Sequence, residues 1–274
     1  MLLLGCDFSS SPTARKPIVV SFGDADGECV HLRGFECFAS LDAWGRWLSE
    51  RPEWVGGFDF PFGLPRELIE HLGWPLAWPE LITHYAALER HTIRETFALF
   101  CAARPVGGKF AHRATDGPAG SSPSMKWVNP PVAFMLHAGV PRLLEAGAAL
   151  PGLHMPAGGG TRIALEAYPG LLARELIGRR SYKSDAAASQ TAGRHAARED
   201  LVVALQEGSS RLGLRLVLDP SGRERVLSDA KGDCIDAALC LVQAAWGAAR
   251  KASEGPGYGL PATLDPLEGW ILTS

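Results

Sequence analysis

The sequence lacks the patterns that identify several common classes of protein. None of its six cysteines forms a Cys-x-x-Cys pair, and its eight histidines show neither His-Glu-x-x-His nor His-x-His spacing. Both absences argue against a zinc site, and the scattered cysteines are typical of reduced, buried packing residues. No apolar stretch reaches the roughly 18 residues that span a bilayer, and the apolar start at residues 2–4 is too short for a signal-peptide core. We therefore expect a cytoplasmic protein without membrane partners.

The chain also lacks a large net charge. Its formal charge is −3 over 274 residues, and its contents of 46% hydrophobic and 21% charged residues are ordinary for a globular protein. This balance argues against a generic nucleic-acid coat protein. Positive charge is nevertheless concentrated in residues 90–126 and 174–198, each with six Arg or Lys against two acidic residues. Each stretch is either a solvated face or a surface that follows phosphates.

Hydrophobic patterning predicts an α/β fold with a mixed five-stranded sheet flanked by helices. Apolar runs bounded by turn signals place strands at 2–7, 17–22, 28–38, 54–59 and 161–167. Apolar residues at helical spacing place helices at 39–53, 81–101, 168–177, 185–207 and 229–249. The strand at 54–59 returns parallel to the first strand, because residues 39–53 are long enough for a crossover. We expect a single domain, 1–274, with a helical and loop insertion at about 66–150.

Two aspartates end apolar strands. Asp7 ends the first predicted strand, and Asp59 ends the fourth. Side chains at the carboxyl ends of parallel neighbouring strands lie in one crevice, so we expect these two carboxylates to meet. Taken singly, each would be read as a turn or cap residue. Together they are costly to bury without a cation, which points to a bound metal.

A second acidic pair begins the last predicted helix. Asp233 and Asp236 are three residues apart, so their carboxylates share a helix face and reach a common ion. Acidic residues near the positive end of a helix dipole also act as caps, and Asp229 fits that role better than metal binding. The pair therefore has two readings, metal ligands and caps, and we expect metal ligands.

Glu166 and Lys183 complete the predicted site. Glu166 ends the fifth predicted strand in apolar surroundings and needs a partner, which would be a metal, Arg162 or Lys183. Lys183 and Arg194 are the candidates for binding a flanking phosphate. The predicted catalytic set is Asp7, Asp59, Glu166, Lys183, Asp233 and Asp236, of which the four aspartates are the predicted metal ligands. Oxygen-only ligands favour Mg²⁺ or Mn²⁺. Two such ions could activate a water molecule and stabilise the leaving oxygen during cleavage of a phosphodiester bond.

Five segments carry a family resemblance. They are GCDF (5–8), GFDFPFGLP (57–65), EAYP (166–169), DCIDAA (233–238) and EGWI (268–271). In these segments the chain resembles a prokaryotic domain-of-unknown-function family (number 429), whose members are regarded as predicted RNase H-like nucleases. The acidic pattern is also similar to the Holliday-junction resolvase branch of that superfamily, which has Glu where this chain has Asp59 and no counterpart of Glu166. The resemblance implies an RNase H-like fold, metal-dependent nuclease activity, and DNA or RNA as the partner.

Two other functions compete with a nuclease. Residues 7–11 (DFSSS) loosely resemble the first phosphate loop of actin-like ATPases and sugar kinases, although the glycine run at 157–161 lacks the acid of their second loop. The chain could then be a nucleotide phosphotransferase. Alternatively, it is a catalytically inactive nucleic-acid-binding module, since the two basic stretches serve binding as well as catalysis.

Overall fold

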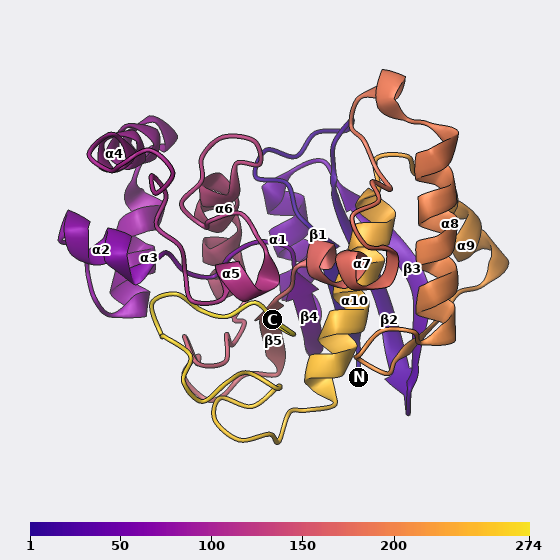
Figure 1. The fold of residues 1–274 in the computed structure, drawn as a ribbon. Helices are drawn as coiled ribbons and strands as arrows, with labels where there is room; N and C mark the ends of the chain where they lie inside the picture. Colours follow the sequence, from indigo (N-terminus) through magenta and orange to yellow (C-terminus); the bar gives the residue numbers. More distant parts are fainter.

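A computed structural model describes residues 1–274 and has an α/β architecture built on one mixed sheet (Figure 1). The sheet has six strands in the order β5-β4-β1-β2-β3-β6. The strands are β1 (Leu3–Asp7), β2 (Ile18–Asp26), β3 (Cys29–Phe38), β4 (Trp54–Phe58), β5 (Arg162–Glu166) and β6 (Arg215–Val217). Strands β1, β2 and β3 pair antiparallel, whereas β4 is parallel to β1, β5 to β4 and β6 to β3.

The five predicted strands are all present, and the parallel return of β4 is confirmed. The prediction of only five strands was wrong, because β6 adds a sixth strand at the edge of the sheet, next to β3. This strand has three residues with one buried side chain, Leu216, which is too short to show an alternating pattern in the sequence. The turn expected over residues 23–27 is also shorter than predicted. Strand β2 continues past a bulge at Phe22/Gly23, and the chain turns at Gly27, where φ is 56°.

Four helices cover one face of the sheet, with α10 lying across its centre (Figure 1). They are α7 (Pro169–Ile177), α8 (Ala192–Glu207), α9 (Pro220–Ser228) and α10 (Asp233–Ala248). Helix α10 is buried almost all round, as expected for a helix that is largely apolar after its first turn. Helix α8 begins seven residues later than predicted, at the point where Thr191 caps it by accepting a hydrogen bond from the Arg194 N–H. The short helix α9 was not predicted.

The helices before β5 lie beyond the other side of the sheet, some of them near its strands and the rest farther out (Figure 1). They are α1 (Leu41–Ser49), α2 (Arg66–Leu72), α3 (Trp78–Ala87), α4 (Arg90–Ala102), α5 (Asp116–Ala119) and α6 (Val132–Glu145). All but α1 belong to the segment 66–150. Apolar residues of α1, α2, α3, α4 and α6 join those of β1, β2 and β4 in one core. The single helix predicted over 81–101 was wrong: Leu88 and Glu89 are extended and separate α3 from α4. None of the helices is long and apolar enough to span a membrane.

Two glycines let the backbone of α10 lie directly on the sheet. Gly5 of β1 and Gly57 of β4 are paired in register. A Cβ atom on Gly5 would lie 2.1 Å from the Ala237 carbonyl oxygen, and one on Gly57 would lie 2.5 Å from the Cys240 carbonyl oxygen. Any larger residue would push the helix away from the strands. This close approach brings the first turn of α10 to the carboxyl ends of β1 and β4.

Candidate active site

Asp7 and Asp59 lie side by side at the carboxyl ends of β1 and β4. The Asp59 N–H donates to the Cys6 carbonyl oxygen at 2.9 Å, which continues the parallel ladder by one residue. Because side chains alternate between the faces of a strand, Asp7 points to the same face as Gly5, and Asp59 to the same face as Gly57. That is the face on which α10 packs. The predicted meeting of these two strand ends is therefore confirmed.

Asp236 approaches the same point from the first turn of α10. Its side chain is fully buried. The Tyr182 hydroxyl donates to Asp236 Oδ1 at 2.6 Å, and the Lys183 ammonium forms an ion pair with Oδ2. The segment that carries Lys183 lies against Gly232, whose φ of 81° and lack of a side chain leave room for it, because a Cβ atom there would lie 2.6 Å from Lys183 Cβ.

The negative charge of the site is only partly compensated. Of the four predicted metal ligands, Asp236 alone takes part in an ion pair. Burial, followed by the charge of Asp236, raises the pKa of Asp7 well above its usual range and that of Asp59 to about 7. Burial lowers the pKa of Lys183, but its interactions with Asp236, Tyr182 and Asp7 together outweigh burial, and the pKa lies well above its usual value. The site thus has a deficit of positive charge that a cation would relieve.

Asp233 lies nearer the solvent than Asp236. Burial and the charge of Asp229 raise the pKa of Asp233 to about 6, and Asp233 in turn contributes to the raised pKa of Asp7. The N-cap role predicted for Asp229 was wrong, because Gly232 occupies the N-cap position of α10. The Asp229 carboxylate still accepts hydrogen bonds from the N–H groups of Lys231 at 3.1 Å and Cys234 at 2.8 Å. Helix α10 therefore begins at Asp233 rather than Asp229, and both Asp233 and Asp236 lie in its first turn.

The acids open onto a polar cleft of about 580 Å³. Asp7, Asp59 and Asp233 line it together with the loop that follows β1, including Ser9, Ser10 and Ser11. Four cationic side chains also line the cleft: Lys16, Arg90, Lys183 and Lys231. Arg90 is fixed by donating to the Ser11 hydroxyl at 2.7 Å and to the Ser10 carbonyl oxygen. The cleft thus combines an acidic floor with cations that can contact an anionic ligand.

Arg194 does not line this cleft. Its guanidinium donates to the Ser181 hydroxyl at 3.0 Å and to the Ser189 carbonyl oxygen, so it braces the loop that carries Lys183. Of the two cations predicted to bind a flanking phosphate, the structure places Lys183 in the cleft and gives Arg194 a supporting position.

The donor chemistry of the acids fits a divalent cation. Asp7, Asp59, Asp233 and Asp236 offer only carboxylate oxygens, the ligands that Mg²⁺ and Mn²⁺ prefer. No three acidic, histidine or cysteine side chains are arranged as a ready-made metal-binding group. The Lys183 ammonium lies against Asp236 and supplies part of the positive charge that an ion would bring. Metal binding by these residues therefore requires side-chain adjustment around Asp236 and stays a prediction.

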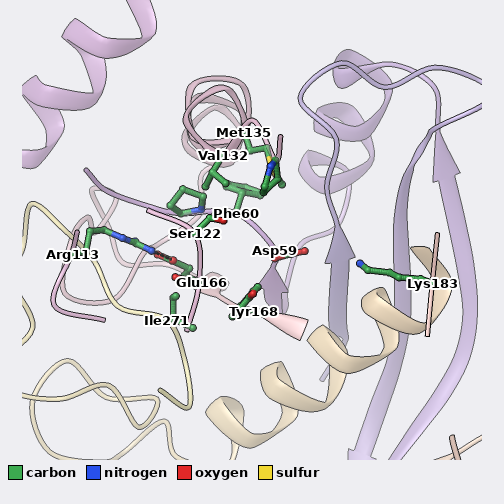
Figure 2. A pocket seen from close by; sticks show the side chains of 14 residues that line it. Asp59, Phe60, Arg113, Ser122, Val132, Met135, Glu166, Tyr168, Lys183 and Ile271 are labelled. Atoms are coloured by element: carbon green, nitrogen blue, oxygen red, sulfur yellow. Dashed lines mark hydrogen bonds and ion pairs between the residues drawn. The ribbon is translucent and has the colours of Figure 1, made fainter. Parts of the chain in front are cut away.

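Glu166 has a partner that the sequence did not reveal. Arg113 donates to Glu166 Oε1 at 2.7 Å and to Oε2 at 2.8 Å (Figure 2). The same guanidinium donates to Asp116 Oδ1 at 2.9 Å. Arg162 and Lys183 were predicted as partners of Glu166, and both predictions were wrong. Arg162 donates instead to the backbone carbonyl oxygens of residues 49 and 51, and Lys183 pairs with Asp236. The position in the strand explains the difference. Glu166 pairs with Phe58 in register, so it points to the face opposite Asp59.

Glu166 and Arg113 belong to a buried cluster that fixes the loop after Asp59. The Phe62 N–H donates to Glu166 Oε2 at 3.0 Å, and the Arg66 N–H donates to Glu268 Oε1 at 2.8 Å. Arg113 also donates to the Glu268 carbonyl oxygen at 3.0 Å. The motifs at 57–65, 166–169 and 268–271 therefore meet in space. They support Asp59 from the face of the sheet opposite to α10.

Six residues of the site and its support were not predicted: Lys16, Arg90, Arg113, Tyr182, Lys231 and Glu268. Arg90 and Arg113 belong to a stretch whose excess positive charge was noted, but nothing in the sequence indicates which of its cations face the cleft. Glu268 was quoted within a motif without a role. Comparisons with protein-family models, with curated proteins and with solved structures found no match to this chain.

Proposed function

We propose that this protein is a nuclease that hydrolyses phosphodiester bonds with the help of divalent Mg²⁺ or Mn²⁺. The observation that carries the proposal is the convergence of Asp7, Asp59 and Asp236, of which only Asp236 has a cationic partner. Asp7 and Asp59 are half-buried. Clustered carboxylates that are partly withdrawn from water and lack cationic partners are costly, and they are typical of sites that bind a cation.

The arrangement of the strands supports assignment to the RNase H-like superfamily. Three antiparallel strands are followed by β4 and β5, which lie parallel to β1 on its other side. The acids occupy the end of β1, the end of β4 and the first turn of the last helix, which is the acidic pattern of the resolvase branch. We include membership of the domain-of-unknown-function family 429 in the same proposal, on the motifs that meet around Asp59. The edge strand β6 is an addition to the five-stranded pattern.

Each residue then has a role that follows from its position. Asp7 and Asp59 form the floor of the cleft and, with Asp236 and the more exposed Asp233, are the groups that would hold the cation. A divalent cation bound by these carboxylates makes a water molecule more acidic and stabilises negative charge on the leaving oxygen. The cations that line the cleft, Lys16, Arg90, Lys183 and Lys231, would contact the phosphates on either side of the cleaved bond.

A nucleotide phosphotransferase is less well supported. Its two phosphate loops must meet at one end of the sheet. Ser9, Ser10 and Ser11 line the cleft, but the glycine run at 157–161 precedes β5, where the Trp54 N–H donates to the Thr161 carbonyl oxygen at 3.1 Å. This is the amino end of β4 and β5, whereas Asp59 lies at the carboxyl end.

A purely binding role is also less well supported. Uncompensated acids repel a polyanion, so a module that only binds nucleic acid gains nothing from Asp7 and Asp59. A catalytic site that holds a cation needs them.

Cleavage assays test the proposal. Pure protein is incubated with Mn²⁺ and with end-labelled single-stranded, branched and DNA–RNA hybrid substrates. We expect cleavage that is lost in Asp7→Asn and in Asp236→Asn. Asp7→Asn is the cleaner variant, since its side chain forms no ion pair whose loss would perturb the fold. Asp200→Asn, which changes an exposed acid paired with Arg180 on the surface, is the matched control and should cleave like the wild type. No cleavage of any substrate, or cleavage that survives both active-site changes, contradicts the proposal.

A further inference from the structure

A second, smaller pocket opens beside the cleft (Figure 2). Its volume is about 220 Å³, and it shares Asp59, Lys183, Pro130 and Met135 with the cleft. Figure 2 shows Asp59 between the Arg113–Glu166 pair on one side and Lys183 on the other. A ligand in the pocket therefore lies next to the acids, and it can be continuous with a ligand in the cleft.

The walls of the pocket differ from those of the cleft. Phe60, Val132, Tyr168 and Ile271 provide apolar surface, and Met135 adds a flexible thioether. Ser121 and Ser122 provide hydroxyl groups. The Ser121 hydroxyl donates to Asp116 Oδ1 at 3.1 Å, so its oxygen is still able to accept a hydrogen bond. The charged residues Arg113, Glu166, Asp59 and Lys183 also border the pocket. An apolar pocket bordered by polar groups suits a flat ring that has polar edges.

The aromatic wall is held in place. The Arg174 guanidinium lies 5.4 Å from the centre of the Tyr168 ring and donates to its hydroxyl at 3.3 Å. The Tyr168 ring packs over Gly170, where a Cβ atom would lie 2.9 Å from the ring carbons. The Tyr168 N–H donates to Gln243 Oε1 at 3.2 Å, which ties the backbone to α10. Because the ring is already ordered, a ligand that packs against it loses little conformational entropy from this side chain.

We propose that this pocket holds one unpaired nucleobase of the substrate, adjacent to the phosphodiester bond over the acids. The inference rests on the proposed nuclease function and adds the substrate class, a strand with an unpaired nucleotide at the cleavage point. At 220 Å³ the pocket is smaller than the roughly 300–1,000 Å³ of drug-sized ligand sites, so it takes a single ring system. A base inside a regular duplex cannot enter such a pocket without leaving its stack.

The insertion between β4 and β5 then acquires a function. Ser121, Ser122, Val132 and Met135 come from residues 66–150 and form part of the pocket wall, whereas Asp59 and Tyr168 come from the ends of β4 and β5. The strands provide the acids, and the insertion provides much of the surface that selects the nucleotide beside them.

Abasic substitution tests the proposal in the wild-type protein. The cleaved bond is first mapped on a single-stranded substrate with Mn²⁺. The nucleotides on either side of that bond, and one nucleotide five positions away, are then replaced singly by an abasic site. We expect kcat/KM to fall by at least about fivefold for an abasic site on one side of the bond, the effect of losing a base–aromatic contact, and to be unchanged for the distant position. A fully paired duplex should be cleaved more slowly than the single strand.

Filling the pocket provides the second arm. Val132→Trp places a large side chain in the pocket, and Val128→Trp makes the same change at an exposed position of the same insertion. We expect Val132→Trp to cleave intact and abasic substrates at equal, reduced rates, and Val128→Trp to keep the wild-type preference. Equal rates with intact and abasic substrates in the wild type, or equal rates on duplex and single strand, overturn the inference while leaving the nuclease proposal intact. If no nucleic acid is cleaved at all, both fall together.

Discussion

Replacing Asp59 with asparagine should stabilise the metal-free protein. Asp59 lies half-buried in a negatively charged site, and its partial burial and the charge of Asp236 raise its pKa to about 7. Asparagine has the same shape and carries no charge, so the variant removes the repulsion while keeping the packing. When replacing a residue makes the protein more stable, that residue is typically kept for ligand binding rather than for stability.

The magnitude follows from the pKa. A change from 3.8 to about 7 corresponds to about 4 kcal/mol at 1.36 kcal/mol per pKa unit. Because the Asp59 side chain borders the cleft and keeps some contact with solvent, we expect roughly half of this, about 2 kcal/mol, in the free energy of unfolding. The raised pKa means that folding takes up a proton, so the penalty is absent below the unfolded pKa and is complete above pH 7. The advantage of Asp59→Asn should therefore be about 2 kcal/mol at pH 8 and should fall to about 0.5 kcal/mol at pH 4.

Urea unfolding in the presence of EDTA, followed by circular dichroism at both pH values, measures this difference. Asp26→Asn, which changes an exposed acid at the end of β2, is the control and should alter stability by less than about 0.5 kcal/mol. Added Mn²⁺ should stabilise the wild type and reverse the order of the two proteins at pH 8. An Asp59→Asn protein less stable than the wild type at pH 8 in EDTA would refute the electrostatic reasoning.

Three further substitutions test other parts of the structure. Gly5→Ala should destabilise the protein by about 3 kcal/mol in urea unfolding, because its Cβ atom would lie 2.1 Å from the Ala237 carbonyl oxygen; a change below about 1 kcal/mol would contradict the close packing of α10. Arg113→Met should cost about 3–5 kcal/mol by the same measurement, since it leaves Glu166 buried without a partner, and a neutral effect would show that the pair is dispensable. Lys183→Met should tighten Mn²⁺ binding in calorimetric titration, because the ammonium competes with the ion for the acids; weaker binding would show instead that Lys183 helps to hold the metal site together.

The positions of the strands and of the two strand-end aspartates could be read from the sequence. Two apolar runs end in Asp7 and Asp59, and the segment between them is long enough for a crossover. The two strands are therefore parallel neighbours, and their carboxyl ends lie at the same end of the sheet. The pair Asp233 and Asp236 was placed at the start of the last helix on local spacing alone. Such local patterns predict structure correctly because the burial of one face of a strand or helix requires apolar residues at a regular spacing.

The role of Glu166 could not be read in the same way, although one signal was available. Its place in β5 is one residue short of the level of Asp59, and the alternation of side chains sends it to the opposite face. Ala167 stands at the level of Asp59, where its N–H donates to the Phe58 carbonyl oxygen at 2.9 Å. A register prediction accurate to one residue would have separated Glu166 from the acids, but the partner Arg113, 53 residues away in a loop, has no local signature.

The break between α3 and α4 and the short strand β6 depend on tertiary contacts. The Leu88 carbonyl oxygen lies 2.9 Å from the His137 Nε2, a contact from helix α6 that accompanies the extended backbone at Leu88. Strand β6 exists because the edge of β3 offers partners, and the Arg215 N–H donates to the Glu28 carbonyl oxygen at 2.8 Å. Neither contact is encoded in the residues that form the element itself.

Crystals soaked with Mn²⁺ test the central claim most directly, since anomalous scattering locates the ion without reference to activity. The account predicts an anomalous peak within coordination distance, about 2–2.5 Å, of carboxylate oxygens from Asp7, Asp59 and Asp236, with the Lys183 ammonium moved away from Asp236. The same soak of Asp7→Asn crystals should weaken or abolish the peak. A wild-type structure in which Lys183 still pairs with Asp236 and no ion lies among these aspartates would contradict the claim that they form a metal site.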